Sequence, residues 1–144
     1  VEKYSVFKNY PNTLNIEIYK TKFLAKLQKD KKNYYLGSNG KLIKATDLNQ
    51  NLPFIFGDFQ NKNFFELKEA IDKTNFDYNR IKNLFFFKSG RWDIETNDGL
   101  LIKLPRENIA KSLEMVSIFF KKNEKKKIKI IDLRQPSQII IDAR

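Results

Sequence analysis

The residues best suited to chemistry are three carboxylates in one short stretch, Asp93, Glu95 and Asp98. Asp93 and Glu95 are two residues apart on a predicted strand, so they project from one face and could act as a general acid and base. The polar face of a half-exposed sheet has the same spacing, and we favour this structural interpretation. Asp132 lies close enough to Arg134 to predict a structural ion pair.

The residue types that most enzymes and metal sites need are missing. The chain contains neither His nor Cys, which excludes the commonest general base and metal ligand, a thiol nucleophile and any disulfide. It also lacks the glycine-rich phosphate loops, the HExxH zinc motif and the GxSxG nucleophile motif. We therefore expect no catalytic activity, no metal and no cofactor.

The chain is strongly basic, with a formal net charge of +11 over 144 residues. Such a charge is typical of proteins that bind nucleic acids or anionic membranes. Only five of the cations are Arg, whose planar fork suits phosphate and base recognition better than Lys does. The coding bias of an AT-rich genome also produces many Lys, Asn, Ile and Phe residues, and we favour this explanation. The alternative is a basic β-rich nucleic-acid-binding module that stacks bases on the rings of Tyr34, Tyr35, Phe85, Phe86 and Phe87.

A β-hairpin is predicted at residues 90–105, around the three carboxylates. Trp92, Ile94 and Thr96 alternate with polar residues, which is the period of a strand with one buried face. The sequence Asn-Asp-Gly at 97–99 favours a tight turn, and an apolar strand follows it. We expect Trp92, the only Trp, to anchor the core.

The remaining pattern combines two helices with several strands. Residues 63–73 and 107–122 have the period of amphipathic helices, and shorter alternating segments around them predict strands. Residues 29–33 are expected to form a charged loop. This order predicts an α+β fold, a mostly antiparallel β-sheet with two amphipathic helices packed on one side. No apolar run approaches the roughly 18–20 residues that a membrane-spanning helix needs.

Six short motifs resemble, in order, motifs of the periplasmic part of the bacterial FtsQ/DivIB cell-division family. The segment 10–18 resembles the family's "(W/Y)PxTLxVxV" strand, the hairpin its "RRWxLxLxxGxxxxLP" motif, and residues 131–134 its "(V/I)DLR" motif. Tyr19, Phe23 and Ser38 depart from the family pattern. The residues of these motifs are Tyr10, Pro11, Asn12, Thr13, Leu14, Ile16, Ile18, Ala25, Gly40, Leu52, Pro53, Gly57, Arg91, Trp92, Asp93, Ile94, Asn97, Gly99, Leu104, Pro105, Ile131, Asp132, Leu133 and Arg134.

The resemblance implies a non-catalytic, single-pass protein of the inner membrane. Its periplasmic part would bind divisome partners of the FtsB and FtsL type at the division septum. Residues 1–28 would be the C-terminal strands of a truncated POTRA-like domain, and residues 29–144 the FtsQ-type β domain. Because the chain starts at Val1 without Met, we expect it to be a fragment whose N-terminal part is missing.

A partner-binding site is expected at the C-terminal end of the chain. Pro136 has no N–H to donate, so its segment belongs at a sheet edge or a bulge, where a partner strand can add. The alternative is that Pro136 only protects the edge against aggregation. In the family this segment receives a β-strand of FtsB, and Arg134 would face an acidic side chain. The expected site consists of Arg134, Gln135, Pro136, Ser137, Gln138, Ile139, Ile140 and Ile141.

Overall fold

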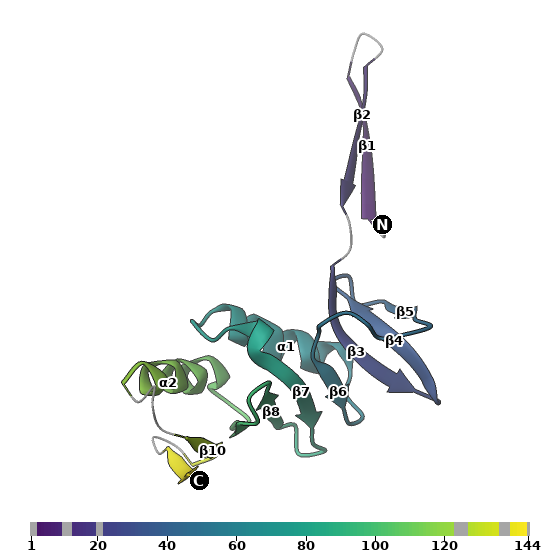
Figure 1. The fold of residues 1–144 in the computed structure, drawn as a ribbon. Helices are drawn as coiled ribbons and strands as arrows, with labels where there is room; N and C mark the ends of the chain where they lie inside the picture. Colours follow the sequence, from purple (N-terminus) through teal and green to yellow (C-terminus); the bar gives the residue numbers. More distant parts are fainter. Residues whose placement is uncertain (1–2, 10–12, 20–21, 123–126, 136–138, 144) are drawn as a thin grey trace. The chain divides into compact units, whose positions relative to one another are not determined.

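The computed structural model describes residues 3–9, 13–19, 22–122, 127–135 and 139–143 (Figure 1). The chain divides into two compact units, Val1–Gln50 and Asn51–Arg144. The boundary predicted after residue 28 stays a prediction. Within the described residues, no helix is long and apolar enough to cross a membrane.

The regular elements described in the first unit are all strands, paired antiparallel within two groups. The first two strands pair with each other, and the next three form a sheet in chain order. The predicted charged loop at 29–33 is wrong, because Asp30 and Lys31 alone form the turn between β3 and β4. Their φ angles of 52° and 64° suit a two-residue hairpin. The strands are β1 (Lys3–Asn9), β2 (Thr13–Tyr19), β3 (Phe23–Lys29), β4 (Lys32–Gly37) and β5 (Leu42–Lys44).

The second unit is a six-stranded mixed sheet with two α-helices. Its strands follow chain order, and the pairs β6–β7 and β9–β10 are parallel while the other pairs are antiparallel. The elements are β6 (Phe54–Phe56), α1 (Asn61–Asp72), the 3-10 helix η1 (Tyr78–Arg80), β7 (Ile81–Phe86), β8 (Trp92–Thr96), β9 (Leu101–Lys103), α2 (Ile109–Lys122), β10 (Ile128–Asp132) and β11 (Ile140–Ala143).

Each parallel pair is joined by one of the helices. Parallel strands need a crossover connection, and α1 joins β6 to β7 while α2 joins β9 to β10. Both crossovers step in the same direction along the sheet between strands of the same orientation. Right-handed connections therefore place both helices on one face, where they lie next to each other (Figure 1). The predicted α+β fold is confirmed.

The core lies between these helices and the sheet. Trp92 is 2% exposed and contacts the rings of Phe86 and Phe59, with centroids 4.8 Å and 6.0 Å away. The predicted anchoring role of Trp92 and the predicted hairpin are confirmed. Side chains from both helices and four strands complete the core: Phe64, Leu67, Ile71, Leu84, Ile94, Ile102, Leu113, Val116 and Ile131.

Candidate functional site

The parallel pairing of β9 and β10 creates the candidate site. Lys103 on β9 lies opposite Asp132 on β10, and the Leu133 N–H donates to the Lys103 carbonyl at 2.9 Å. Leu104 and Leu133, which follow the two strands, are buried and hold the chain against the core. The sequence that leads into α2 and the sequence that leads toward β11 therefore start side by side.

Arg134 is exposed at the start of this second segment, and Asp132 holds it. Its Nε donates to both carboxylate oxygens of Asp132, at 2.9 and 3.1 Å, and its Nη2 donates to Oδ2 at 2.6 Å. Hydrogen bonds from Arg134 lower the pKa of the Asp132 carboxyl, so it is ionised at neutral pH. The predicted ion pair is confirmed.

Charged side chains form a row across three strands beside this pair. Asp93 on β8 lies opposite Lys103 on β9, and Lys103 lies opposite Asp132 on β10. Arg91 Nη1 donates to Asp93 Oδ1 at 3.3 Å and to the Leu104 carbonyl at 3.0 Å. Burial raises the pKa of the Asp93 carboxyl, while the Arg91 charge opposes this shift. The row alternates in sign along the register, and Arg91 and Arg134 pair with its two carboxylates.

The carboxylates of β8 are structural groups in this arrangement. Asp93 is 5% exposed, so the expected half-exposed polar face is wrong for this residue. Its burial follows from Arg91, which reaches back over the strand to both Asp93 and Leu104. Glu95 is half-buried and accepts a hydrogen bond from Asn83 Nδ2 at 2.6 Å. Across the described ranges, no three acidic residues form a group that could hold a metal ion.

Strand β11 ends the sheet order, next to β10. Its antiparallel register places Ile140 opposite Asp132 and Ile141 opposite Ile131. Ile140 is 50% exposed and Ile141 is 37% exposed. Successive residues of a strand point to opposite faces, so β11 is open to solvent on both faces. An edge strand also carries unpaired backbone donors and acceptors.

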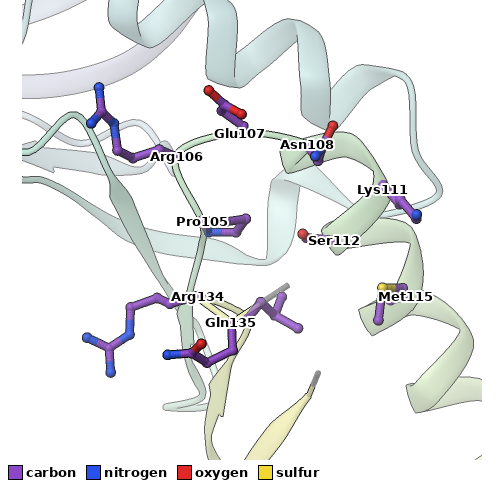
Figure 2. A pocket seen from close by; sticks show the side chains of 10 residues that line it. Pro105, Arg106, Glu107, Asn108, Lys111, Ser112, Met115, Arg134 and Gln135 are labelled. Carbon is purple, nitrogen blue, oxygen red and sulfur yellow. The ribbon is translucent and has the colours of Figure 1, made fainter. Parts of the chain in front are cut away.

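A groove of about 610 Å³ lies between the first half of α2 and the segment after β10. Figure 2 shows Pro105 and Ser112 in its middle, with Arg106 on one side and Arg134 and Gln135 on the other. Met115 lines the groove one turn further along α2. Arg134 contributes to the wall, but its guanidinium turns away from α2 (Figure 2).

The structure places part of the predicted site at this corner. Arg134 and Gln135 are exposed beside the groove, Ile139 is half-buried, and Ile140 and Ile141 are exposed on β11. Three further members of the predicted site, Pro136, Ser137 and Gln138, lie outside the described residues.

Sequence reasoning missed the residues that α2 contributes. Ile109, Leu113, Val116 and Phe120 form an apolar stripe, but its buried members Leu113 and Val116 belong to the core. The groove is lined instead by Lys111, Ser112 and Met115, on a different face of α2. In the sequence only Lys111, a basic residue in the first turn of α2, could have indicated a binding surface there, and one such residue is weak evidence by itself.

Comparison with known proteins agrees with the order of the sequence motifs and with the fold. The family profile described as "Cell division protein FtsQ/DivIB, C-terminal" matches residues 25–134, which is more than half of the chain. The chain belongs to the FtsQ/DivIB family. FtsQ/DivIB proteins are non-catalytic components of the divisome, which agrees with the expectation that this chain has no catalytic activity.

One relative is the cell division protein FtsQ of Bradyrhizobium diazoefficiens. It is 26% identical over 144 aligned residues, which cover 95% of this chain and 41% of that protein. The chain thus spans less than half the length of this FtsQ relative.

A solved structure with the same fold is the major extracytoplasmic domain of the cell division protein DivIB from Geobacillus stearothermophilus. The two structures superpose with a TM-score of 0.52 at 12% sequence identity, over 74% of this chain and 97% of that domain. The fold is therefore that of a DivIB extracytoplasmic domain.

Proposed function

We propose that this chain is the extracytoplasmic part of a non-catalytic divisome scaffold that binds partners of the FtsB and FtsL type. In this proposal a partner strand adds to β11 at the segment 134–141. The observation that carries the proposal is the position of β11 at the end of the sheet with both of its faces exposed. FtsQ/DivIB membership supports a divisome protein as the partner.

The exposure of β11 favours strand addition over contact through one face alone. Ile140 and Ile141 point to opposite faces, and both remain partly accessible to solvent. A partner strand that pairs with the outer edge places its own side chains beside both isoleucines. Its backbone then satisfies the unpaired groups of β11.

Arg134 supplies a charged contact at the start of the same segment. Its hydrogen bonds to Asp132 use Nε and Nη2, which leaves Nη1 for a carboxylate of the partner. Because Asp132 already orders the side chain, binding loses less side-chain entropy than it would with a free Arg. Arg134 is thus positioned to select an acidic side chain beside the added strand.

The family also suggests the surroundings of the chain. We propose a single-pass protein of the inner membrane, with this part in the periplasm at the division septum and residues 1–28 as the end of a POTRA-like domain. The likeness to a DivIB extracytoplasmic domain supports the periplasmic position.

Calorimetric titration with the extracytoplasmic segment of the FtsB-type protein from the same organism tests the proposal. Arg134→Glu and Ile141→Pro should each weaken binding about tenfold or more, because they add a repulsive charge or remove a backbone donor. Arg80→Glu is a matched control, since the Arg80 side chain is 42% exposed, close to the 45% of Arg134, and also pairs with a carboxylate, that of Asp98. Leu42→Pro on β5 is a second control, since Leu42 is 37% exposed, as Ile141 is.

The two controls should bind the partner as wild type does. Circular dichroism first shows which variants remain folded. If folded Arg134→Glu and Ile141→Pro both bind as tightly as wild type, β11 is not the binding edge and the proposal is wrong.

A further inference from the structure

We propose that the face of the second unit's sheet that lies away from α1 and α2 binds an arginine side chain of a partner protein, in a hollow between Phe85 and Glu95. The site does not depend on strand addition at β11, so it goes beyond the proposed function. The hollow has a volume of about 480 Å³, and its lining includes Phe85, Asp93, Glu95, Leu101, Lys129 and Ile130.

The register shows which side chains share this face. The core side chains that lie opposite one another across β7 to β10 are Leu84, Ile94, Ile102 and Ile131. Their neighbours in each strand point to the other side of the sheet, which we call the open face. Across the same four strands, one row of the open face consists of Asn83, Glu95, Leu101 and Ile130.

Aromatic surface remains accessible on the open face. Phe56 on β6 is 44% exposed, and Phe85 on β7 is half-buried beside it. The two rings stack with their centroids 5.1 Å apart and an angle of 11° between their planes. Phe56 therefore covers the side of Phe85 that faces away from β8. The hollow lies on the β8 side, where the second face of the Phe85 ring can attract a cation.

Glu95 supplies a carboxylate next to this ring. Its side chain is half-buried, and its Oε1 accepts a hydrogen bond from Asn83 Nδ2 at 2.6 Å, which holds the carboxylate in place. None of the ion pairs within the described part of the chain includes Glu95, whereas Arg91 pairs with Asp93. A cation from a partner would therefore supply a counter-charge to Glu95.

A ring beside a carboxylate favours Arg over Lys as the bound side chain. A planar guanidinium can stack on an aromatic face while its N–H groups donate to a carboxylate, and a compact ammonium cannot do both as well. Lys129 lines the hollow but is exposed, so its flexible stem can turn the ammonium to solvent. The formal net charge of +11 disfavours contact of a basic segment with other surfaces of the chain.

The other end of the hollow suits an apolar side chain. Leu101 and Ile130 are half-buried and lie one and two strands beyond Glu95, about 5 and 10 Å away at the usual strand spacing. Side chains two residues apart in an extended segment lie on one side, about 7 Å apart. An extended segment with the pattern Arg-x-Leu therefore places Leu between Leu101 and Ile130 when its Arg meets Glu95.

Three end-capped peptides test this assignment by NMR titration of the chain. Their sequences are Ser-Arg-Ser-Leu-Ser, Ser-Lys-Ser-Leu-Ser and Ser-Glu-Ser-Leu-Ser. The Arg peptide should shift the amide signals of Glu95, Leu101 and Ile130, the Lys peptide should bind several-fold more weakly, and the Glu peptide should not bind. Absence of shifts with the Arg peptide, or equal binding of the three, overturns the proposal. Equal binding of the Arg and Lys peptides overturns the assignment to arginine.

Matched substitutions test the carboxylate. Glu95→Gln keeps an oxygen that can accept from Asn83 and removes only the charge, so it should weaken binding of the Arg peptide about tenfold. Glu66→Gln is the control, because Glu66 is exposed on α1 and does not line the hollow. It should bind as wild type does. Lys129→Gln removes the repulsive cation of the lining and should strengthen binding.

A second matched pair tests the ring. Phe85→Leu removes the aromatic face and should weaken binding, while Phe87→Leu changes a ring that is 39% exposed and does not line the hollow. The amide spectrum of each variant shows whether it remains folded. If Glu95→Gln and folded Phe85→Leu both bind the Arg peptide as wild type does, the proposal is wrong.

Sedimentation velocity distinguishes a partner from a second copy of the chain. The proposal predicts that wild type and Glu95→Gln have the same oligomeric state, and that the Arg peptide does not change it. If wild type forms a dimer that Glu95→Gln dissociates, the open face is an interface between copies and the proposal is wrong. None of these measurements uses the FtsB-type segment, so they test the hollow separately from strand addition at β11.

Discussion

Arg134 binds the carboxylate of Asp132 through its side chain and its backbone at once. The guanidinium contacts lie between 2.6 and 3.1 Å, and the Arg134 backbone N–H donates to Asp132 Oδ1 at 3.0 Å. The backbone contact fixes the turn after β10 in the way of an Asx-turn. The pair therefore sets both the direction of the segment toward β11 and the orientation of its exposed cation.

Asp132→Asn should lower the free energy of unfolding at neutral pH and have little effect in strong acid. Hydrogen bonds from Arg134 lower the pKa of the Asp132 carboxyl below its usual 3.8 in the folded state. The stabilisation is thus complete above the unfolded value of 3.8 and is lost as pH falls through the lower folded pKa. Urea midpoints of wild type and variant, measured from about pH 2 to 7, should converge in acid. If the urea midpoints of wild type and Asp132→Asn moved further apart in acid, the ion pair between Asp132 and Arg134 would not be the source of the stabilisation.

Asp93→Asn should show the opposite pH dependence. Burial raises the pKa of the Asp93 carboxyl above 3.8, so the folded state takes up its proton more readily than the unfolded chain. The ionised group then costs stability at neutral pH, and this cost disappears as pH falls through the folded pKa. Relative to wild type, the variant should become less stable as the solution is acidified toward about pH 4. The same series of urea midpoints measures this change in relative stability. If the midpoints of wild type and Asp93→Asn differed by the same amount at every pH, the prediction would be wrong.

Trp92→Ala should cost about 3–5 kcal/mol of unfolding free energy, as large-to-small substitutions in a core do. The ring is 2% exposed and contacts Phe59 and Phe86, so little of the cavity can close. Phe87→Ala is the control, because Phe87 is 39% exposed. Urea denaturation followed by circular dichroism compares the two. A loss below about 0.5 kcal/mol for Trp92→Ala would mean that the ring does not anchor the core.

The local pattern of residues 90–105 was sufficient to predict the hairpin. Trp92, Ile94 and Thr96 are all buried, as their alternation indicates, and Gly99 adopts the φ of 87° that the turn needs. Such features depend on neighbours in sequence. The two-residue turn at Asp30 and Lys31 was missed because neither residue is the Gly that marks such turns.

The surroundings of the site could not be predicted from local patterns. The burial of Asp93 depends on Arg91, which folds back to the Leu104 carbonyl of the next strand. The groove joins Pro105 and Met115 to Leu133 and Gln135, which are distant in sequence and meet through the parallel pairing of β9 and β10. Both features depend on tertiary structure, which residue spacing does not report.

Binding to DNA or RNA should be weak and without sequence preference. The cations are mostly Lys, which attract phosphate but read no bases. Tyr35 is 7% exposed and stacks on Phe23 at 4.8 Å, so it is not available to a base. A competition assay at about 0.15 M salt, with one sequence against scrambled controls, measures the preference. Sub-micromolar affinity for one sequence alone would favour the nucleic-acid-binding alternative.

Amide hydrogen exchange tests strand addition at β11 most directly. Exchange is measured for the free chain and for the chain saturated with the extracytoplasmic segment of the FtsB-type protein. Outward-facing amides within Ile140–Ala143 should exchange about tenfold or more slowly in the complex, because the partner strand accepts their hydrogen bonds. Amides of β5, the edge strand of the other unit, should be unchanged. Saturated binding with unchanged exchange throughout β11 would contradict the account.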